Sequence, residues 1–241
     1  MSPPPWPIKK YSPRHSTWPY TPQDFHRQDA SPDTQFYHQP RFVTHIDDAA
    51  IADLREYYRS VLLPCCTADG GGGRILDFCS SWISHYPGEI EDMVKDGEEG
   101  KGWKITGLGM NYQELEANPI LNNGRICWDL NVEPDLKVAL TSSTTTNTNK
   151  TISKFDISTS ALSIDYLTSP ISVLSSLLDL TNEGGSVHLV ISNRCFPTKA
   201  IARWLRVDEE ERVQMVGDFL HFAGWKGIEI VEEEEGSVVG C

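Results

Sequence analysis

A carboxylate followed at once by small polar residues is the first feature of this sequence that could do chemistry. Asp77 comes directly after the short apolar run Ile75-Leu76, and Cys79 and Ser80 come shortly after it. An apolar run of this length before a turn predicts a buried parallel strand. In a doubly wound sheet, nucleotide-like ligands bind at the carboxyl ends of such strands. We therefore expect Asp77 to accept a hydrogen bond from the ammonium group of a cofactor, with Cys79 and Ser80 lining the same loop.

Two later strand ends carry polar residues as well. Residues 103–108 predict a second strand, followed by Asn111, and residues 125–130 predict a third strand that ends in Asp129-Leu130. The carboxyl ends of parallel strands meet at one edge of a sheet, so these residues should border the same cleft as the first loop. Asn111 also suits the cap of a following helix, and the sequence favours neither role.

Strand and helix patterns alternate along the rest of the chain, which predicts an α/β fold. We expect a Rossmann-like, doubly wound, mostly parallel sheet of six strands, with a C-terminal antiparallel hairpin if residues 237–241 complete it. The other predicted elements are a helix from Asp47 or Asp48 that ends at Pro64, a helix capped by Asn111 with Glu114, a strand over 155–162, a helix from Pro170, a turn at Gly184-Gly185, a strand over 186–192, a helix over 209–222 and a strand over 227–231.

Composition limits the function classes. The formal charge of −13 argues against a nucleic-acid groove, which needs clustered Lys and Arg. No apolar run is long enough for a membrane span, and the N-terminus lacks the apolar core of a secretory signal. We expect a cytoplasmic protein, with import into an organelle left open, and no metal site. The sequence says nothing about the oligomeric state.

The chain divides into an arm and one domain. Residues 1–32 are rich in Pro, Ser and aromatic residues and predict an extended arm, whose Trp6, Trp18 and Tyr20 pack onto the domain surface. Residues 33–241 predict a single domain, with a lid segment over 36–63 at its start.

The order of these motifs resembles the class I S-adenosylmethionine-dependent methyltransferases, closest to the small-molecule branch called type 11. The resemblance covers about residues 74–231 and rests on LDFCSSWISHYP, GLGMNYQELEANPIL, FDISTSALSIDYL, NEGGS and SNRCFPTKAIARW, with FYHQPRFVTHID upstream. It implies that S-adenosylmethionine is the cofactor and that a small molecule accepts the methyl group. The cofactor-binding residues implied by position are Asp77, Cys79, Ser80, Asn111, Asp129, Leu130 and Ser163.

The expected acceptor side consists of the lid segment and the end of the fifth strand. Tyr37 and Arg41 are candidate substrate-binding residues, and Arg41 has the fork geometry that holds a carboxylate. Asn193 and Arg194 follow the fifth strand and face the same side of the sheet. His45 is the candidate general base for a hydroxyl or amine acceptor.

Two departures from the family pattern leave a second function open. The usual glycine-rich loop is replaced by Cys79-Ser80-Ser81-Trp82, and Gly109 stands where the family carries an acid for the ribose hydroxyls. Asn111 is only a neutral substitute for that acid. The alternative is a catalytically inactive, methyltransferase-like binding or regulatory module.

Overall fold

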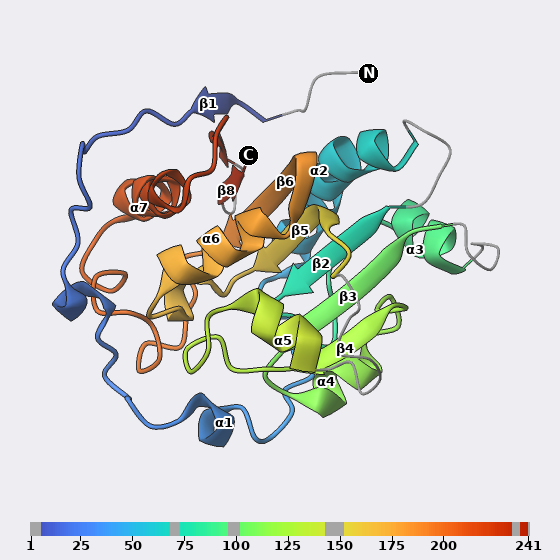
Figure 1. Ribbon diagram of the computed structural model, residues 1–241, viewed down its shortest axis with the longest axis horizontal. Helices are drawn as coiled ribbons and strands as arrows, with labels where there is room; N and C mark the ends of the chain where they lie inside the picture. The colour runs from blue at the N-terminus through green and yellow to red at the C-terminus, as the bar shows by residue number, and fades with distance from the viewer. Residues whose placement is uncertain (1–5, 68–72, 96–101, 143–151, 233–236, 241) are drawn as a thin grey trace.

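The computed structural model describes residues 6–67, 73–95, 102–142, 152–232 and 237–240. In chain order the elements are β1 (Ile8–Lys10), a 3-10 helix (Pro22–Phe25), α1 (Asp33–Phe36), α2 (Asp48–Thr67), β2 (Arg74–Phe78), α3 (Gly88–Lys95), β3 (Lys104–Gly109), α4 (Tyr112–Ala117), β4 (Gly124–Cys127), α5 (Leu136–Ser142), β5 (Phe155–Ala161), a 3-10 helix (Ile164–Tyr166), α6 (Pro170–Asp179), β6 (Thr181–Ile191), α7 (Glu209–Ala223), β7 (Glu229–Glu232) and β8 (Ser237–Gly240) (Figure 1).

All the strands belong to one sheet, in the order β1-β7-β8-β6-β5-β2-β3-β4. Five neighbouring strands pair in parallel, so their carboxyl ends lie at one edge of the sheet; in sheet order they are β6, β5, β2, β3 and β4. Strand β8 is antiparallel to both β6 and β7 and closes the expected C-terminal hairpin. The predicted Rossmann-like fold with a mostly parallel sheet is therefore confirmed.

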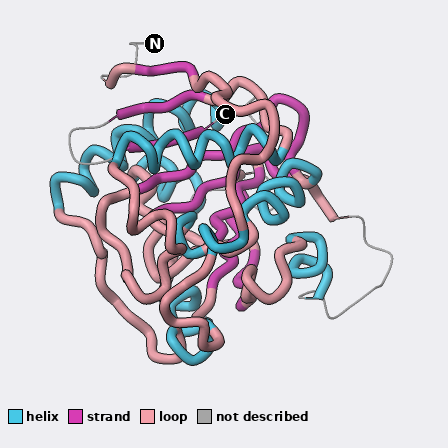
Figure 2. Tube along the Cα trace, turned by 90° about the vertical axis from the view of Figure 1, so that its left-hand side faces the viewer, coloured by secondary structure: helices cyan, strands magenta, loops and turns pink. Residues whose placement is uncertain are grey.

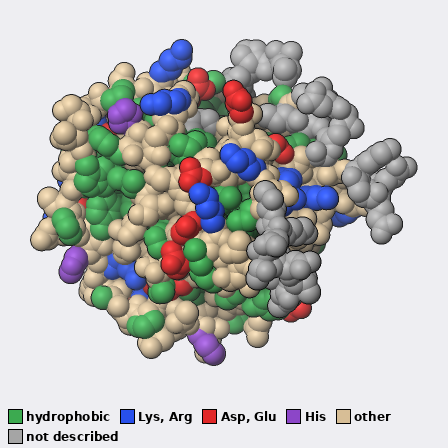
Figure 3. Space-filling view, viewed as in Figure 1, with side chains coloured by type: hydrophobic (Ala, Val, Ile, Leu, Met, Phe, Trp, Pro, Cys, Tyr) green, Lys and Arg blue, Asp and Glu red, His purple; other side chains and the backbone are tan. Residues whose placement is uncertain are grey.

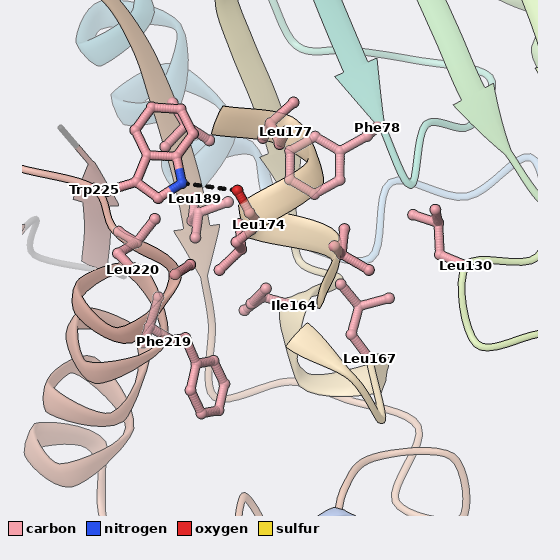
Figure 4. Close-up of a cluster of buried hydrophobic side chains, with 14 of the residues drawn as sticks. Phe78, Leu130, Ile164, Leu167, Leu174, Leu177, Leu189, Phe219, Leu220 and Trp225 are labelled. Carbon is pink, nitrogen blue, oxygen red and sulfur yellow. Dashed lines mark hydrogen bonds between the residues drawn. The ribbon is translucent and has the colours of Figure 1, made fainter. Parts of the chain in front are cut away.

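Helices cover both faces of the sheet. Helices α2, α3 and α4 pack on one face through a core that includes Ile75 and Ile105, and α5, α6 and α7 pack on the other through Leu76 and Phe78. Successive residues of β2 thus face opposite cores, with Ile75 in one and Leu76 in the other. In the second core, Trp225 Nε1 donates to the Leu174 carbonyl at 3.0 Å (Figure 4).

The N-terminal arm is bound to the domain along most of its described length. It runs from β1 to α1 down the left side of the molecule in Figure 1, and Figure 2 shows long loop segments crossing that side. The Trp18 ring contacts Tyr20 and Phe25 within the arm and Phe219 and Phe222 of α7. The arm also adds β1, an edge strand that pairs antiparallel with β7 and that the sequence did not predict.

Several predicted boundaries were wrong. Helix α2 continues past Pro64 to Thr67, so this proline lies inside the helix and does not end it. Strand β6 already begins at Thr181, so Gly184-Gly185 lies inside it, next to a register shift against β5. Strand β4 ends at Cys127 and leaves Asp129 in a loop.

Two features of the structure concern nucleic-acid binding and membrane insertion, the classes that the composition argues against. Acidic and basic side chains lie interspersed on the face shown in Figure 3. Within the ranges given above, no helix combines the length and the apolar content that a membrane span requires.

A buried carboxylate of α7 fastens the arm, and its removal should be costly. Asp218 is fully buried and accepts hydrogen bonds from Tyr11 Oη, from Tyr20 Oη at 2.5 Å and from Arg14 at 2.9 Å. We predict that Asp218→Ala lowers the free energy of unfolding by about 3 kcal/mol, because it leaves buried donors unpaired. Urea unfolding measures the change, and Glu210→Ala, an exposed carboxylate of the same helix, is the control. Equal stability of the two variants would show that the bonds to Asp218 do not hold the arm.

Candidate functional site

A cavity of about 230 Å³ opens where the parallel strands end. Its walls come from the loops that follow β2, β3, β4, β5 and β6, and from residues 33–45 of the N-terminal segment. Nine residues predicted from the sequence to serve the site line this cavity: Tyr37, Arg41, His45, Asp77, Cys79, Ser80, Leu130, Ser163 and Arg194.

Asp77 is the buried acid of this cavity. Its Oδ2 accepts hydrogen bonds from Ser80 Oγ at 2.6 Å and Ser84 Oγ at 2.7 Å, and its Oδ1 accepts one from Thr159 Oγ1 at 3.1 Å. A carboxylate has about four lone-pair positions, so Oδ1 retains room for one further donor. Burial raises the pKa of Asp77 to about 6, although the three hydroxyls favour the charged form. The group is ionised at neutral pH and can bind a cation.

Glu114 ties the N-terminal segment to the loop after β2. Its Oε1 accepts a hydrogen bond from the backbone N–H of Arg41 at 2.7 Å, and its Oε2 accepts one from Ser81 Oγ at 2.6 Å. Trp82 adds a bond from its Nε1 to the Val43 carbonyl at 3.1 Å. The segment before α2 is therefore held against the cavity by side chains of the loop that it covers.

An aromatic cluster forms the wall opposite that loop. The Arg41 guanidinium carbon lies 4.4 Å from the ring centroid of Phe36 and 5.3 Å from that of Phe196. The His45 ring packs edge-on against Phe196, with 5.3 Å between the centroids. Burial and the nearby charge of Arg41 lower the pKa of His45, so its imidazole is neutral at pH 7 and can accept a proton.

Solved structures place this arrangement among known folds. The chain matches the CurJ carbon methyltransferase with a TM-score of 0.53 and 14% identity, over 88% of this chain and 57% of that one. It also matches the plantazolicin methyltransferase BamL, solved in complex with a triazolic desmethylPZN analog and SAH, with a TM-score of 0.49 and 12% identity, over 91% of this chain and 93% of that one. A third match is a SAM dependent methyltransferase from Aquifex aeolicus, with a TM-score of 0.44 and 16% identity, over 81% of this chain and 96% of that one. No family model and no curated protein sequence matches the chain.

The chain has the class I methyltransferase fold. Its sheet carries the antiparallel strand β8 between β6 and β7, and the cavity lies at the edge where this fold accommodates ligands.

Within this methyltransferase fold, the loop after β2 is shaped without glycine. Cys79 takes the left-handed conformation with φ 55°, and Ser80 N–H donates to the Leu108 carbonyl at 2.7 Å. Burial raises the pKa of the Cys79 thiol to about 12, so the sulfur is protonated and acts as an apolar wall. The loop therefore lies directly on the end of β3.

This contact leaves no room for a side chain at position 109. A Cβ atom on Gly109 would lie 2.0 Å from the Ser80 carbonyl oxygen. Backbone atoms cannot move aside as a flexible side chain can, so the loop and a side chain at this position exclude each other.

Three residues predicted to serve the site do not line the cavity. Asn111 caps α4: its Oδ1 accepts from Gln113 N and Glu114 N, and its Nδ2 donates to the carbonyls of Tyr37 and His38. Every hydrogen-bonding position of that amide is occupied by the protein, so it has none left for a ribose. Asp129 accepts from the backbone of Asn131 in a local turn, and Asn193 is exposed.

The sequence did not indicate several residues that line the cavity. Glu114 has the spacing of a capping box with Asn111, but its carboxylate bonds elsewhere, and only the fold could show this. Others include Asp33, Trp128, Asn131, Tyr166 and Phe196. Phe196 belongs to the SNRCFPTKAIARW motif, which was a usable signal.

Restoring the family acid should therefore harm the protein. We predict that Gly109→Asp lowers the free energy of unfolding by at least about 2 kcal/mol, because the new side chain displaces the Ser80 backbone. Urea unfolding compares it with Gly88→Asp, where a Cβ meets nothing within 4 Å. A Gly109→Asp variant as stable as Gly88→Asp would show that the loop after β2 is not held against β3.

Proposed function

We propose that this protein transfers the methyl group of S-adenosylmethionine to a small-molecule acceptor. The observation that carries the proposal is Asp77, a buried carboxylate at the end of the first parallel strand with one acceptor position directed to no protein donor. Such a group suits the ammonium of an adenosyl amino acid. The methyltransferase fold supports the same assignment.

The residues that line this cavity fit the cofactor. Asp77 would hold the amino-acid end, with Cys79 and Ser80 beside it, and Leu130 and Trp128 would border the adenosyl end. When bound, S-adenosylmethionine would supply a methyl group on a positively charged sulfur, and an electron pair of the acceptor would bond the methyl carbon as the carbon–sulfur bond breaks and S-adenosylhomocysteine leaves as the uncharged thioether. Ser163 lines the cavity after β5 and is a further candidate contact.

The remaining walls would position and enclose the acceptor. Segment 37–45 acts as the lid, whereas residues 48–63 of the predicted lid segment form α2 and pack on the sheet. Tyr37, Arg41 and Arg194 are the proposed acceptor contacts. His45 is the proposed base for an acceptor that must lose a proton, because its imidazole is uncharged at pH 7.

The alternative function is a binding or regulatory module that holds the cofactor without turnover. The blocked position at Gly109 favours it, because the ribose hydroxyls then lack a charged partner. Calorimetry with S-adenosylhomocysteine tests cofactor binding for both functions. Methyl transfer from radiolabelled S-adenosylmethionine to a broad panel of small molecules separates them. Absence of binding at millimolar ligand would contradict both.

Charge at Asp77 should set the cofactor affinity. We predict that Asp77→Asn weakens S-adenosylhomocysteine binding at pH 7.5 by about tenfold to a hundredfold, through loss of a charge-assisted hydrogen bond. Calorimetry measures the change, and Asp179→Asn, which alters an exposed carboxylate of α6, is the control and should bind as the wild type does.

The same residue predicts a pH dependence. Wild-type affinity should fall as pH drops through about 6, where Asp77 takes up a proton, whereas Asp77→Asn should show no step there.

The free energy of unfolding should depend on pH with the opposite sign. The folded state holds this proton more tightly than the unfolded chain, so the wild type loses stability relative to the Asn variant as pH rises from about 4 to about 6. Parallel pH profiles of the two proteins would contradict the assignment.

A further inference from the structure

We infer that the acceptor is a small organic carboxylic acid, whose carboxylate binds the guanidinium of Arg41 and whose apolar body lies against the aromatic wall. The inference rests on the proposed function for the identity of the acceptor site. The carboxylate is assigned as a binding group, and the atom that receives the methyl group is left open.

The first step is that the carboxylates of the cavity already have their own donors. Three carboxylates line it in the described part of the chain: Asp33, Asp77 and Glu114. Hydroxyls of Ser80, Ser84 and Thr159 bond Asp77, and Glu114 bonds Ser81 and the backbone N–H of Arg41. Neither carboxylate bonds a guanidinium.

Asp33 is the most fully occupied of the three. It accepts hydrogen bonds from Arg27 at 2.8 and 2.9 Å and from Asn131 Nδ2 at 2.8 Å, and Lys199 Nζ lies 3.2 Å away. Burial raises its pKa, but the bonds from Arg27 and Asn131 outweigh burial, and the net shift is downward. Asp33 is therefore an ionised group that is already paired with protein cations, Arg27 and Lys199.

Arg41 is left without a carboxylate among the described residues. Its guanidinium donates once, from Nη2 to the Phe36 carbonyl at 3.0 Å, and lies over the rings of Phe36 and Phe196. Ring stacking covers the faces of a guanidinium and leaves its N–H edge for a planar anion. The bond from Glu114 fixes the Arg41 backbone, so the fork is held in place before an acceptor arrives.

The second cation differs in environment. Arg194 lines the cavity but is exposed, and its nearest carboxylate is Asp47 at 3.4 Å. A rim charge of this kind raises the rate of encounter with an anion more than the affinity. Arg41 is half-buried, so a carboxylate bound there is less screened by solvent.

The aromatic side chains that line the cavity indicate what the acceptor carries besides its carboxylate. Tyr37, Tyr166 and Phe196 line the acceptor side, and Trp82 borders it from the loop after β2. Rings in this arrangement favour a flat apolar body of about the size of one aromatic ring. Charge and rings together specify a carboxylic acid with such a body.

The test compares acids with their amides on the full-length chain. The probes are benzoate, phenylacetate and 3-phenylpropanoate, each paired with its primary amide, titrated with and without saturating S-adenosylhomocysteine and followed by ligand-observed NMR. We expect at least one acid to bind about tenfold more tightly than its amide, as one charge-assisted contact provides. Acid and amide binding equally, or no acid binding at millimolar concentration, would overturn the inference.

Variants assign the effect to one side chain. Arg41→Gln should lower the affinity for the preferred acid at least tenfold and change the affinity for its amide by less than twofold. Arg41→Lys keeps the charge without the fork, so its affinity for the acid should lie between those of the wild type and Arg41→Gln. Arg59→Gln, an exposed arginine of α2 that bonds Glu89, should bind as the wild type does. Unchanged acid affinity in a folded Arg41→Gln variant would refute the role of Arg41.

The two proposals fail in different ways. Loss of S-adenosylhomocysteine binding contradicts the proposed function. The comparison of acids with amides in the absence of S-adenosylhomocysteine still measures binding at Arg41. Cofactor binding with no preference for acids contradicts only the inference about the acceptor.

Discussion

The site depends on the balance between two effects on the buried carboxylate of Asp77: burial disfavours its charge, and hydrogen bonds from three hydroxyls favour it. Two of its hydrogen-bond donors, Ser80 and Ser84, belong to the loop that follows it, and the third, Thr159, belongs to the neighbouring strand β5. The bonds that stabilise the charge therefore also fold the loop onto the sheet. A loop shaped in this way does not need the glycines that the family uses, because side chains supply the constraint that backbone freedom supplies elsewhere.

Residues 29–33, which precede the proposed lid, are fixed to the domain because a buried charge requires them. Lys199 has no exposed side-chain surface, and its ammonium bonds Asp29, Ser31 and Asp33 of the N-terminal segment. Detaching that segment would leave a buried cation without partners, which costs several kcal/mol. The aromatic wall and the Arg41 fork are thus built into the unliganded fold, and little ordering entropy remains to be lost on binding.

Local patterns in the sequence predicted most of the fold and the half of the site that lies on strand ends. The position of Asp77 followed from an apolar run and a turn, and parallel strands then brought Leu130, Ser163 and Arg194 to one cavity. Interactions between distant segments were not predictable: β1 exists only because β7 offers an edge, and Glu114 lies at the site only because the Arg41 backbone reaches it. The bonds of the Asn111 amide to a helix end and to the backbone of Tyr37 could not be read from local patterns either.

Backbone strain is concentrated around the same cavity. In the described part of the chain, the non-glycine residues with positive φ are His45, Cys79, His85 and Leu162, and all four line it. Each costs of order 1–3 kcal/mol and persists only where surrounding bonds over-determine it. Here those bonds have a consequence for recognition. The Ser80 N–H is already paired with the Leu108 carbonyl, so this backbone donor is not available to a ligand. Side chains of opposite charge, Asp77 and Arg41, line the same cavity, and the proposals assign the first to the ammonium group of the cofactor and the second to the carboxylate of the acceptor.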